Sequence, residues 1–121
     1  MNQAIAIMLG GALGALSRYW ISSAVYLLLG RNFPYGTLTV NLLGSFFMGL
    51  LSVLLLNKFP NETLTSLLLV GFLGAFTTFS TFSLDNMQLI QQGELFKALA
   101  NMLLNVGLCL VAIWLGMLSA K

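Results

Sequence analysis

The segment GFLGAFTTFSTFSLD, residues 71–85, interleaves phenylalanines with five hydroxyl side chains inside an otherwise leucine-rich chain. On a continuous α-helix, Phe72, Phe76, Phe79 and Phe82 would follow steps of four, three and three residues and form one slowly drifting stripe. Such a stripe in a membrane helix is usually explained by packing. The hydroxyl groups beside the rings suggest a second explanation.

Two β-branched residues in succession, Thr77 and Thr78, disfavour a regular helix interior, here shortly after Gly74. We therefore expect the helix to unwind at this point. Unwinding frees backbone carbonyls, which are tolerated at membrane depth only where they are buried in protein or line an aqueous cavity. Carbonyl and threonine oxygens suit a small cation, whereas the positive edge of a phenylalanine ring can weakly favour an anion. The segment predicts an ion path, with helix packing as the competing interpretation.

The composition indicates an integral membrane protein. The 121-residue chain is 59% hydrophobic and 7% charged, whereas soluble domains carry about 25% charged residues. The chain has no histidine, one cysteine and a net charge of +2. These counts argue against an internal disulfide, histidine-based metal or acid–base chemistry, and an electrostatic affinity for nucleic acid. No constellation of residues supports an enzyme.

Four stretches are long and apolar enough to cross a bilayer, which takes roughly 20 residues. They cover about residues 4–29, 35–57, 63–90 and 95–119 of one membrane domain, 1–121. The short loops between them require consecutive helices to be antiparallel neighbours. The expected fold class is an all-α membrane protein with four transmembrane helices, the third broken near its middle.

The loop charges are balanced between the two sides of the membrane. Arg31 and Lys97 favour one side, and Lys58 and Lys121 favour the other. The positive-inside rule therefore assigns almost no preferred orientation. Charge alone leaves two interpretations open: a weakly oriented protein, or dual topology, in which copies inserted both ways can pair as an antiparallel dimer.

Small residues four positions apart predict close helix contacts. The first span contains Gly10 and Gly14, and the third contains Gly71 and Ala75. Packing is the expected role of these residues.

Arg18 lies near the middle of the first span, where a charge costs ~2.5–3.5 kcal/mol. The carboxylates of Glu62, Asp85 and Glu94 all lie near predicted span ends, so none is placed to neutralise it. Two interpretations remain open: a structural pairing of the guanidinium, or a water-facing charge that attracts anions. An unpaired deep cation would favour an anionic cargo.

Three asparagines are also placed at membrane depth. Asn41 lies about two turns into the second span, and Asn101 and Asn105 share one face of the fourth through their i, i+4 spacing. Carboxamides in lipid often join helices by hydrogen bonds. A polar track for an ion is the other interpretation of Asn101 and Asn105, and the spacing alone does not separate the two.

Three motifs together closely resemble the Fluc (CrcB) family of bacterial fluoride channels. They are G-x-x-G-A-F-T-T-F-S-T-F-S at 71–83, GGALGALSRY at 10–19 and G-T-x-x-V-N-x-x-G-S-F at 36–46. The resemblance spans all four helices. It implies a fluoride-selective channel of the bacterial inner membrane, formed by a dual-topology antiparallel homodimer with two pores, through which cytoplasmic fluoride leaves passively.

The resemblance also implies a fluoride pathway. Phe79 and Phe82 correspond to the ring pair that contacts fluoride, and Asn41 corresponds to the pore carboxamide. Ser80 and Thr81 correspond to hydroxyls of the same motif.

Further roles come from the same resemblance. Gly74 and Thr77 correspond to the helix break, whose carbonyls, with those of the partner, hold a structural sodium ion. Arg18 corresponds to a first-helix arginine of a vestibule or packing element. Asn101 and Asn105 stand where many relatives carry a tyrosine and a serine, and they complete the expected pathway.

The main alternative is a small multidrug-type proton-coupled transporter, which also has four short helices and can insert both ways. Such a transporter needs a carboxylate deep in the membrane to exchange protons for a cation. None of the three acidic residues is placed for that role. An accessory membrane subunit without transport activity is a third interpretation.

Overall fold

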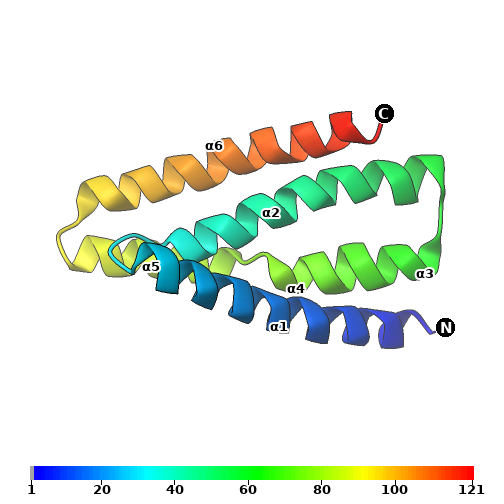
Figure 1. The fold of residues 1–121 in the computed structure, drawn as a ribbon, viewed down its shortest axis with the longest axis horizontal. Coiled ribbons are helices and arrows are strands. Elements are labelled where there is room, and N and C mark those ends of the chain that lie inside the picture. The colour runs from blue at the N-terminus through cyan, green and yellow to red at the C-terminus, as the bar shows by residue number, and fades with distance from the viewer. Residues whose placement is uncertain (1) are drawn as a thin grey trace.

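The computed structural model describes residues 2–121, and this part of the chain is helical with no strand. Four long helical spans run side by side and alternate in direction, so that the two termini lie at the same end (Figure 1). All four are long and apolar enough to cross a membrane. The predicted all-α fold with four membrane-crossing helices is confirmed.

The spans end within one residue of the predicted limits. The first is α1, Gln3–Leu29, and the fourth is α6, Leu95–Ser119. The second joins α2, Tyr35–Ser52, to a π-helical segment η1, Val53–Lys58. The third consists of four pieces: α3, Glu62–Leu64; the π-helical η2, Thr65–Leu73; α4, Gly74–Phe76; and α5, Phe79–Gln91.

The third span is broken at Thr77 and Thr78, as predicted. Both residues have extended backbone angles, with φ −85° and ψ 158° at Thr77 and φ −151° and ψ 122° at Thr78. The Thr78 hydroxyl then starts α5 as its N-cap, because its oxygen accepts a hydrogen bond from the Thr81 N–H at 3.1 Å. The family resemblance assigned the break to Gly74 and Thr77, and this is wrong for Gly74, which still belongs to the helical turn before the break; the unwound residues are the two threonines.

The single aromatic stripe expected for a continuous helix does not form, because two extended residues separate Phe76 from Phe79. Phe72 and Phe76 stack on one side of the break, with ring centroids 5.8 Å apart. Phe79 and Phe82 form a separate tilted pair on the other side, at 5.3 Å. The two pairs therefore belong to different surroundings.

Glycines allow the helices to approach closely, as predicted for the first and third spans. A Cβ on Gly10 would collide with the Leu67 carbonyl oxygen, and one on Gly14 with that of Phe72. Gly71 lies against the Ile7 carbonyl in the same α1–η2 contact. Backbone carbonyls cannot move aside cheaply, so these contacts require the absence of a side chain.

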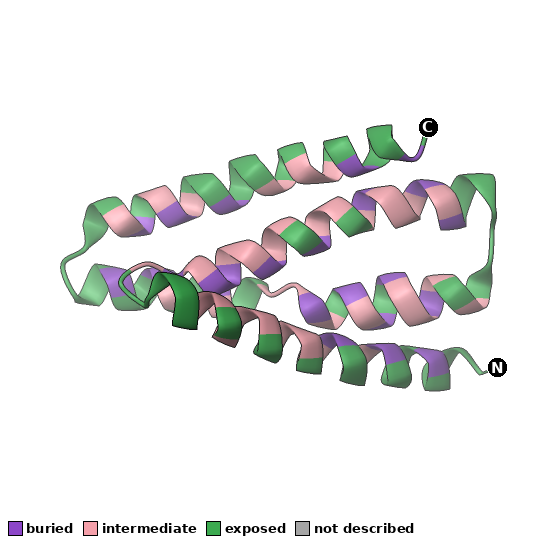
Figure 2. Cartoon of the chain, viewed as in Figure 1, coloured by how far each residue is buried: buried purple, intermediate pink, exposed green. Residues whose placement is uncertain are grey.

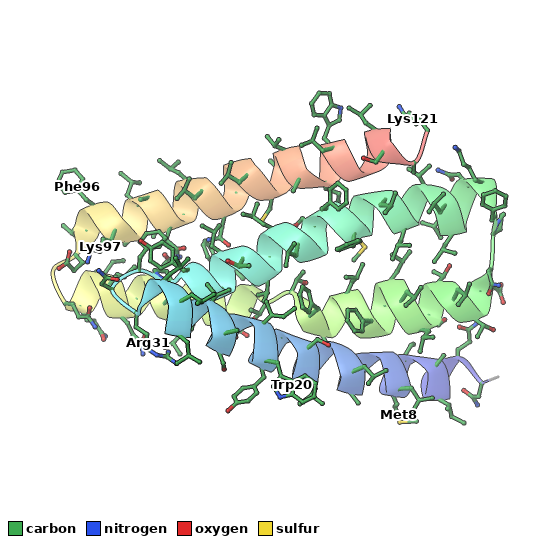
Figure 3. All side chains as sticks on the ribbon, viewed as in Figure 1. Met8, Trp20, Arg31, Phe96, Lys97 and Lys121 are labelled. Atoms are coloured by element: carbon green, nitrogen blue, oxygen red, sulfur yellow. The ribbon has the colours of Figure 1, made fainter. Side chains whose placement is uncertain are left out.

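The buried core is small, and much of the apolar surface faces outward. Val40, Leu69, Leu73 and Phe76 form the core cluster between α2 and the first half of the third span. The outer faces of α1 and α6 are largely exposed (Figure 2). Side chains such as Trp20 and Met8 project away from the bundle (Figure 3). Exposed apolar faces of this kind are suited to contact with lipid.

The loop charges are distributed between the ends as expected. Arg31 and Lys97 lie at one end of the bundle, and Lys121 lies at the other (Figure 3).

Candidate functional site

A groove of about 420 Å³ lies where α2, α6, the break of the third span and the start of α5 meet. It brings together four of the predicted pathway residues: Asn41, Phe79, Phe82 and Asn105. The threonines of the break also line it, and the rest of its wall is formed by Gly44, Ser45, Met48, Val106, Cys109, Leu110 and Ile113. An apolar groove with a few convergent polar groups is the usual form of a binding or conduction site.

Asn41 holds the backbone of the break. Its Oδ1 accepts a hydrogen bond from the Thr78 N–H at 2.8 Å, and its Nδ2 donates to the Thr78 carbonyl oxygen at 3.2 Å. A carboxamide can pair with both groups of one residue because it offers an acceptor and a donor side by side. Asn41 thus replaces hydrogen bonds that a continuous helix would have supplied at Thr78.

Four asparagines form one hydrogen-bonded chain that starts at Asn41. Asn41 Nδ2 donates to Asn105 Oδ1 at 3.0 Å. Asn105 Nδ2 donates to the side-chain and backbone oxygens of Asn101, both at 2.9 Å. Asn101 Nδ2 donates to Asn86 Oδ1 at 2.7 Å. The chain joins α2, α6 and α5 across the interior.

The asparagine chain bears on the two interpretations of the α6 residues. Asn101 is fully buried, with 0% of its surface exposed, and does not line the groove. Asn105 is buried too, but it reaches the groove wall. Both residues make hydrogen bonds between helices, which is one of the two interpretations given by the sequence. Of the two, Asn105 alone lines the groove, as a polar track for an ion would require.

Asn86 was missed by the sequence analysis, although it is buried and ends the chain on α5. The available signal was its position four residues after Phe82, which places the two on one face of a helix. That face is the one directed at α6, where Asn101 lies.

The remaining residues of the motif differ in their surroundings. Phe79 is 76% exposed, whereas Phe82 is 8% exposed. Ser80 is exposed, with its hydroxyl 3.3 Å from that of Thr78. Thr81 is half-buried. Neither Ser80 nor Thr81 lines the groove, so the structure brings only part of the predicted hydroxyl set to it.

At the break, the backbone N–H groups that would normally donate hydrogen bonds to the carbonyls of Gly74 and Thr77 bind other acceptors. In a continuous helix these carbonyls would accept from the N–H groups of Thr78 and Thr81. Here the Thr78 N–H donates to Asn41, and the Thr81 N–H donates to the Thr78 hydroxyl. Freed backbone carbonyls are hard oxygen ligands, so this pair fits a small cation such as sodium. Within residues 2–121 no three His, Cys, Asp or Glu side chains gather as a metal site, and a cation would depend on such carbonyls.

Arg18 donates a hydrogen bond to a third carbonyl at the break, that of Ala75. Its Nε donates to the Ala75 oxygen at 3.0 Å, which satisfies the end of α4 and joins α1 to it. In the described part of the chain the one ion pair joins Lys97 and Glu94 at 3.9 Å, so Arg18 is not paired with a carboxylate there. The contact with Ala75 is the structural pairing that the sequence left open.

A polar pocket of about 220 Å³ lies near the 31–36 loop and includes Arg31 and Asp85. Asp85 Oδ2 accepts a hydrogen bond from the Thr37 hydroxyl at 2.7 Å. Thr37 lies in the first turn of α2, and the acidic group is thus near one end of the spans. This position agrees with the expected lack of a carboxylate at the bundle centre.

A protein-family model described as "CrcB-like protein, Camphor Resistance (CrcB)" matches residues 5–117. Similar proteins include one from Magnetococcus marinus, 57% identical over 95% of this chain and 94% of the relative. Another, from Vibrio parahaemolyticus, is 56% identical over 91% of this chain and 87% of its own.

A third relative, from Methylococcus capsulatus, is 53% identical over 96% of this chain, which spans about half (51%) of that protein's length. All three relatives are named "Fluoride-specific ion channel FluC". The family match covers nearly the whole chain and includes every element of the groove, and the chain therefore belongs to the CrcB family.

Proposed function

We propose that this chain forms a fluoride-selective channel that lets cytoplasmic fluoride leave the cell passively and so protects against fluoride toxicity. The observation that carries the proposal is the groove, in which an aromatic pair and a carboxamide meet at a helix break, in a chain 53–57% identical to proteins named as fluoride channels. The family is one of channels and not of enzymes. Four membrane-crossing helices and bacterial relatives place the chain in the inner membrane as a multi-pass protein.

The chemistry of the groove suits a small anion that must give up water. Phe79 and Phe82 both line the groove, with their rings tilted by 50° to one another. Ring edges carry partial positive charge, and the amide hydrogens of Asn41 can replace part of the lost hydration. Neither group binds as strongly as a lysine would. Weak binding at several points is what conduction requires, because an ion must leave as readily as it enters.

The proposed pore is completed by a second copy of the chain in antiparallel orientation. Phe79, a pathway residue, is mostly exposed on the single chain. Gly74 is exposed as well, and a Cβ there would meet only the Leu69 carbonyl, at 3.8 Å. A partner that covers this surface would enclose the groove, and two-fold symmetry would produce two pores. The balanced charges of the two bundle ends support insertion in both orientations.

A sodium ion at the centre of this dimer would have a structural role. The carbonyls of Gly74 and Thr77 are the proposed ligands, because the break diverts their helical donors. Two carbonyls from each chain would supply four oxygens. When bound, the ion would supply a fixed positive charge that satisfies these carbonyls and holds the two breaks together.

Anion efflux from liposomes that contain the purified protein tests the proposed function. We expect rapid fluoride release with negligible chloride release, and no dependence on a proton gradient. Equally slow release of both anions would contradict a channel. Strict dependence on a proton gradient would favour the multidrug-type transporter.

The sodium proposal predicts that the assembled protein depends on a small monovalent cation. Dialysis into a buffer in which N-methylglucamine replaces sodium should lower the thermal stability of the dimer and slow fluoride efflux, and added sodium should restore both. The two buffers have the same ionic strength, which controls for general salt effects. Indifference of both stability and efflux to the replacement would rule out the site.

A further inference from the structure

We infer that the side-chain oxygen of Asn105 is a built-in competitor for the anion at Asn41, which keeps anion binding weak and release fast. The inference rests on the proposed function, because it concerns how the same groove handles fluoride. It follows from the direction of the hydrogen bonds that link the four asparagines and from the number of hydrogens available on Asn41.

The direction of the asparagine chain is dictated by backbone groups. Asn41 Oδ1 faces the Thr78 N–H, which can only donate, and Asn41 Nδ2 faces the Thr78 carbonyl, which can only accept. The Asn105 nitrogen is identified in the same way, since it faces the backbone carbonyl of Asn101. Rotating either carboxamide by 180° would place like groups against each other at a backbone contact. The Asn105 oxygen is therefore the atom that meets Asn41.

The hydrogens of Asn41 are then fully used within the chain. Its Nδ2 carries two hydrogens, and these serve the Thr78 carbonyl at 3.2 Å and Asn105 Oδ1 at 3.0 Å. An anion that takes a hydrogen bond from Asn41 must displace one of the two acceptors. Thr78 is held to Asn41 by a second bond through its N–H. In the described residues Asn105 Oδ1 accepts from Asn41 alone, so it is the acceptor that costs less to displace.

Both partners of this bond lie on the wall of the groove, together with Phe79 and Phe82. The Asn105 oxygen therefore occupies an acceptor position that an anion passing the rings would need. Breaking the Asn41–Asn105 hydrogen bond requires the same free energy for every anion. This free energy lowers the apparent affinity of the site, because only the state with the bond broken can bind the anion. The Asn41–Asn105 hydrogen bond thus weakens anion binding and speeds anion release, and a conducting site needs fast release.

Replacing Asn105 with leucine tests the inference, because leucine has a similar shape and cannot accept a hydrogen bond. We expect the fluoride concentration that gives half-maximal efflux to fall by about fivefold to tenfold, which is the change in affinity that the loss of one competing hydrogen bond usually causes. We expect maximal efflux not to increase. Half-maximal stabilisation by fluoride in a thermal melt is a second measurement of the same affinity. Leu103→Ala, on the exposed side of the same helix, is the control and should match the unchanged protein.

The outcomes separate this inference from the proposed function. If the unchanged protein does not release fluoride, the proposed function itself fails. If it does, and a folded Asn105→Leu protein keeps the original half-maximal concentration or needs more fluoride, Asn105 is not a competitor. Asn105→Ala removes the same oxygen with a smaller side chain, and the same shift is expected if the leucine variant does not fold.

Discussion

Replacing Phe79 or Phe82 with isoleucine should reduce fluoride efflux by at least about tenfold in each variant, which corresponds to losing about 1.4 kcal/mol of ion stabilisation. Isoleucine keeps the position apolar but has no ring edge to present to an anion. The measurement is initial fluoride efflux from liposomes at matched protein content. Phe96→Ile, at an exposed ring (89%) away from the groove, is the control and should conduct normally.

The different exposure of the two rings separates a role in conduction from one in packing. Phe82 is buried, and its change to isoleucine should also cost about 1 kcal/mol of stability through altered packing. Phe79 is mostly exposed on the single chain, so its loss should affect the chain's own packing little. A Phe79→Ile protein that melts normally, keeps the oligomeric state of the unchanged protein and conducts poorly would support direct contact with the ion. Unchanged efflux in both variants would refute a direct role of the rings.

The second large effect is expected where α2 and α6 touch through glycine. A Cβ on Gly116 would collide with the Phe46 carbonyl oxygen and lie 2.9 Å from the Leu50 nitrogen. A Cβ on Gly49 would collide with the Ile113 carbonyl in the same contact. We expect Gly49→Ala and Gly116→Ala each to destabilise the protein by about 1–3 kcal/mol, because the helices must separate to admit the methyl group.

Gly107→Ala is a matched control in the same helix, since a Cβ there meets nothing within 4 Å. It should be neutral, or stabilising by up to about 1 kcal/mol from the better helix propensity of alanine. Thermal unfolding in detergent, followed by circular dichroism, compares the three variants. Equal melting temperatures for Gly107→Ala and Gly116→Ala would contradict the close contact of α2 and α6.

The fold could be predicted almost entirely from the sequence. Long apolar runs interrupted by proline, asparagine and glycine limit the chain to four crossings, because lipid tolerates no unpaired backbone. The break was predictable for a local reason as well, since adjacent β-branched threonines disfavour a helix interior and Thr78 can cap the next helix. The error of a single phenylalanine stripe came from extending helical periodicity across that break.

The candidate site was only partly predictable. Asn41, Phe79, Phe82 and Asn105 were named from the sequence, and the groove contains all four. Asn86 was not named, because its significance depends on which residue of α6 faces it. Spacing along one helix shows which side chains share a face, but it does not show what that face meets.

Composition, hydropathy and local residue patterns by themselves determined the membrane class, the four spans and the position of the break in this protein, and the family resemblance of its motifs picked out the aromatic pair. These features depend on interactions between neighbours in the chain and on the demands of lipid. Only the tertiary structure decided that Asn41 holds Thr78, that the Arg18 guanidinium donates to the Ala75 carbonyl, and that the hydrogen bonds of the asparagine chain run in one direction, from Asn41 to Asn86. The contacts of Asn41 with Thr78 and Asn105 and of Arg18 with Ala75 join residues 37 to 64 positions apart on different spans, so they exist only once the spans have packed.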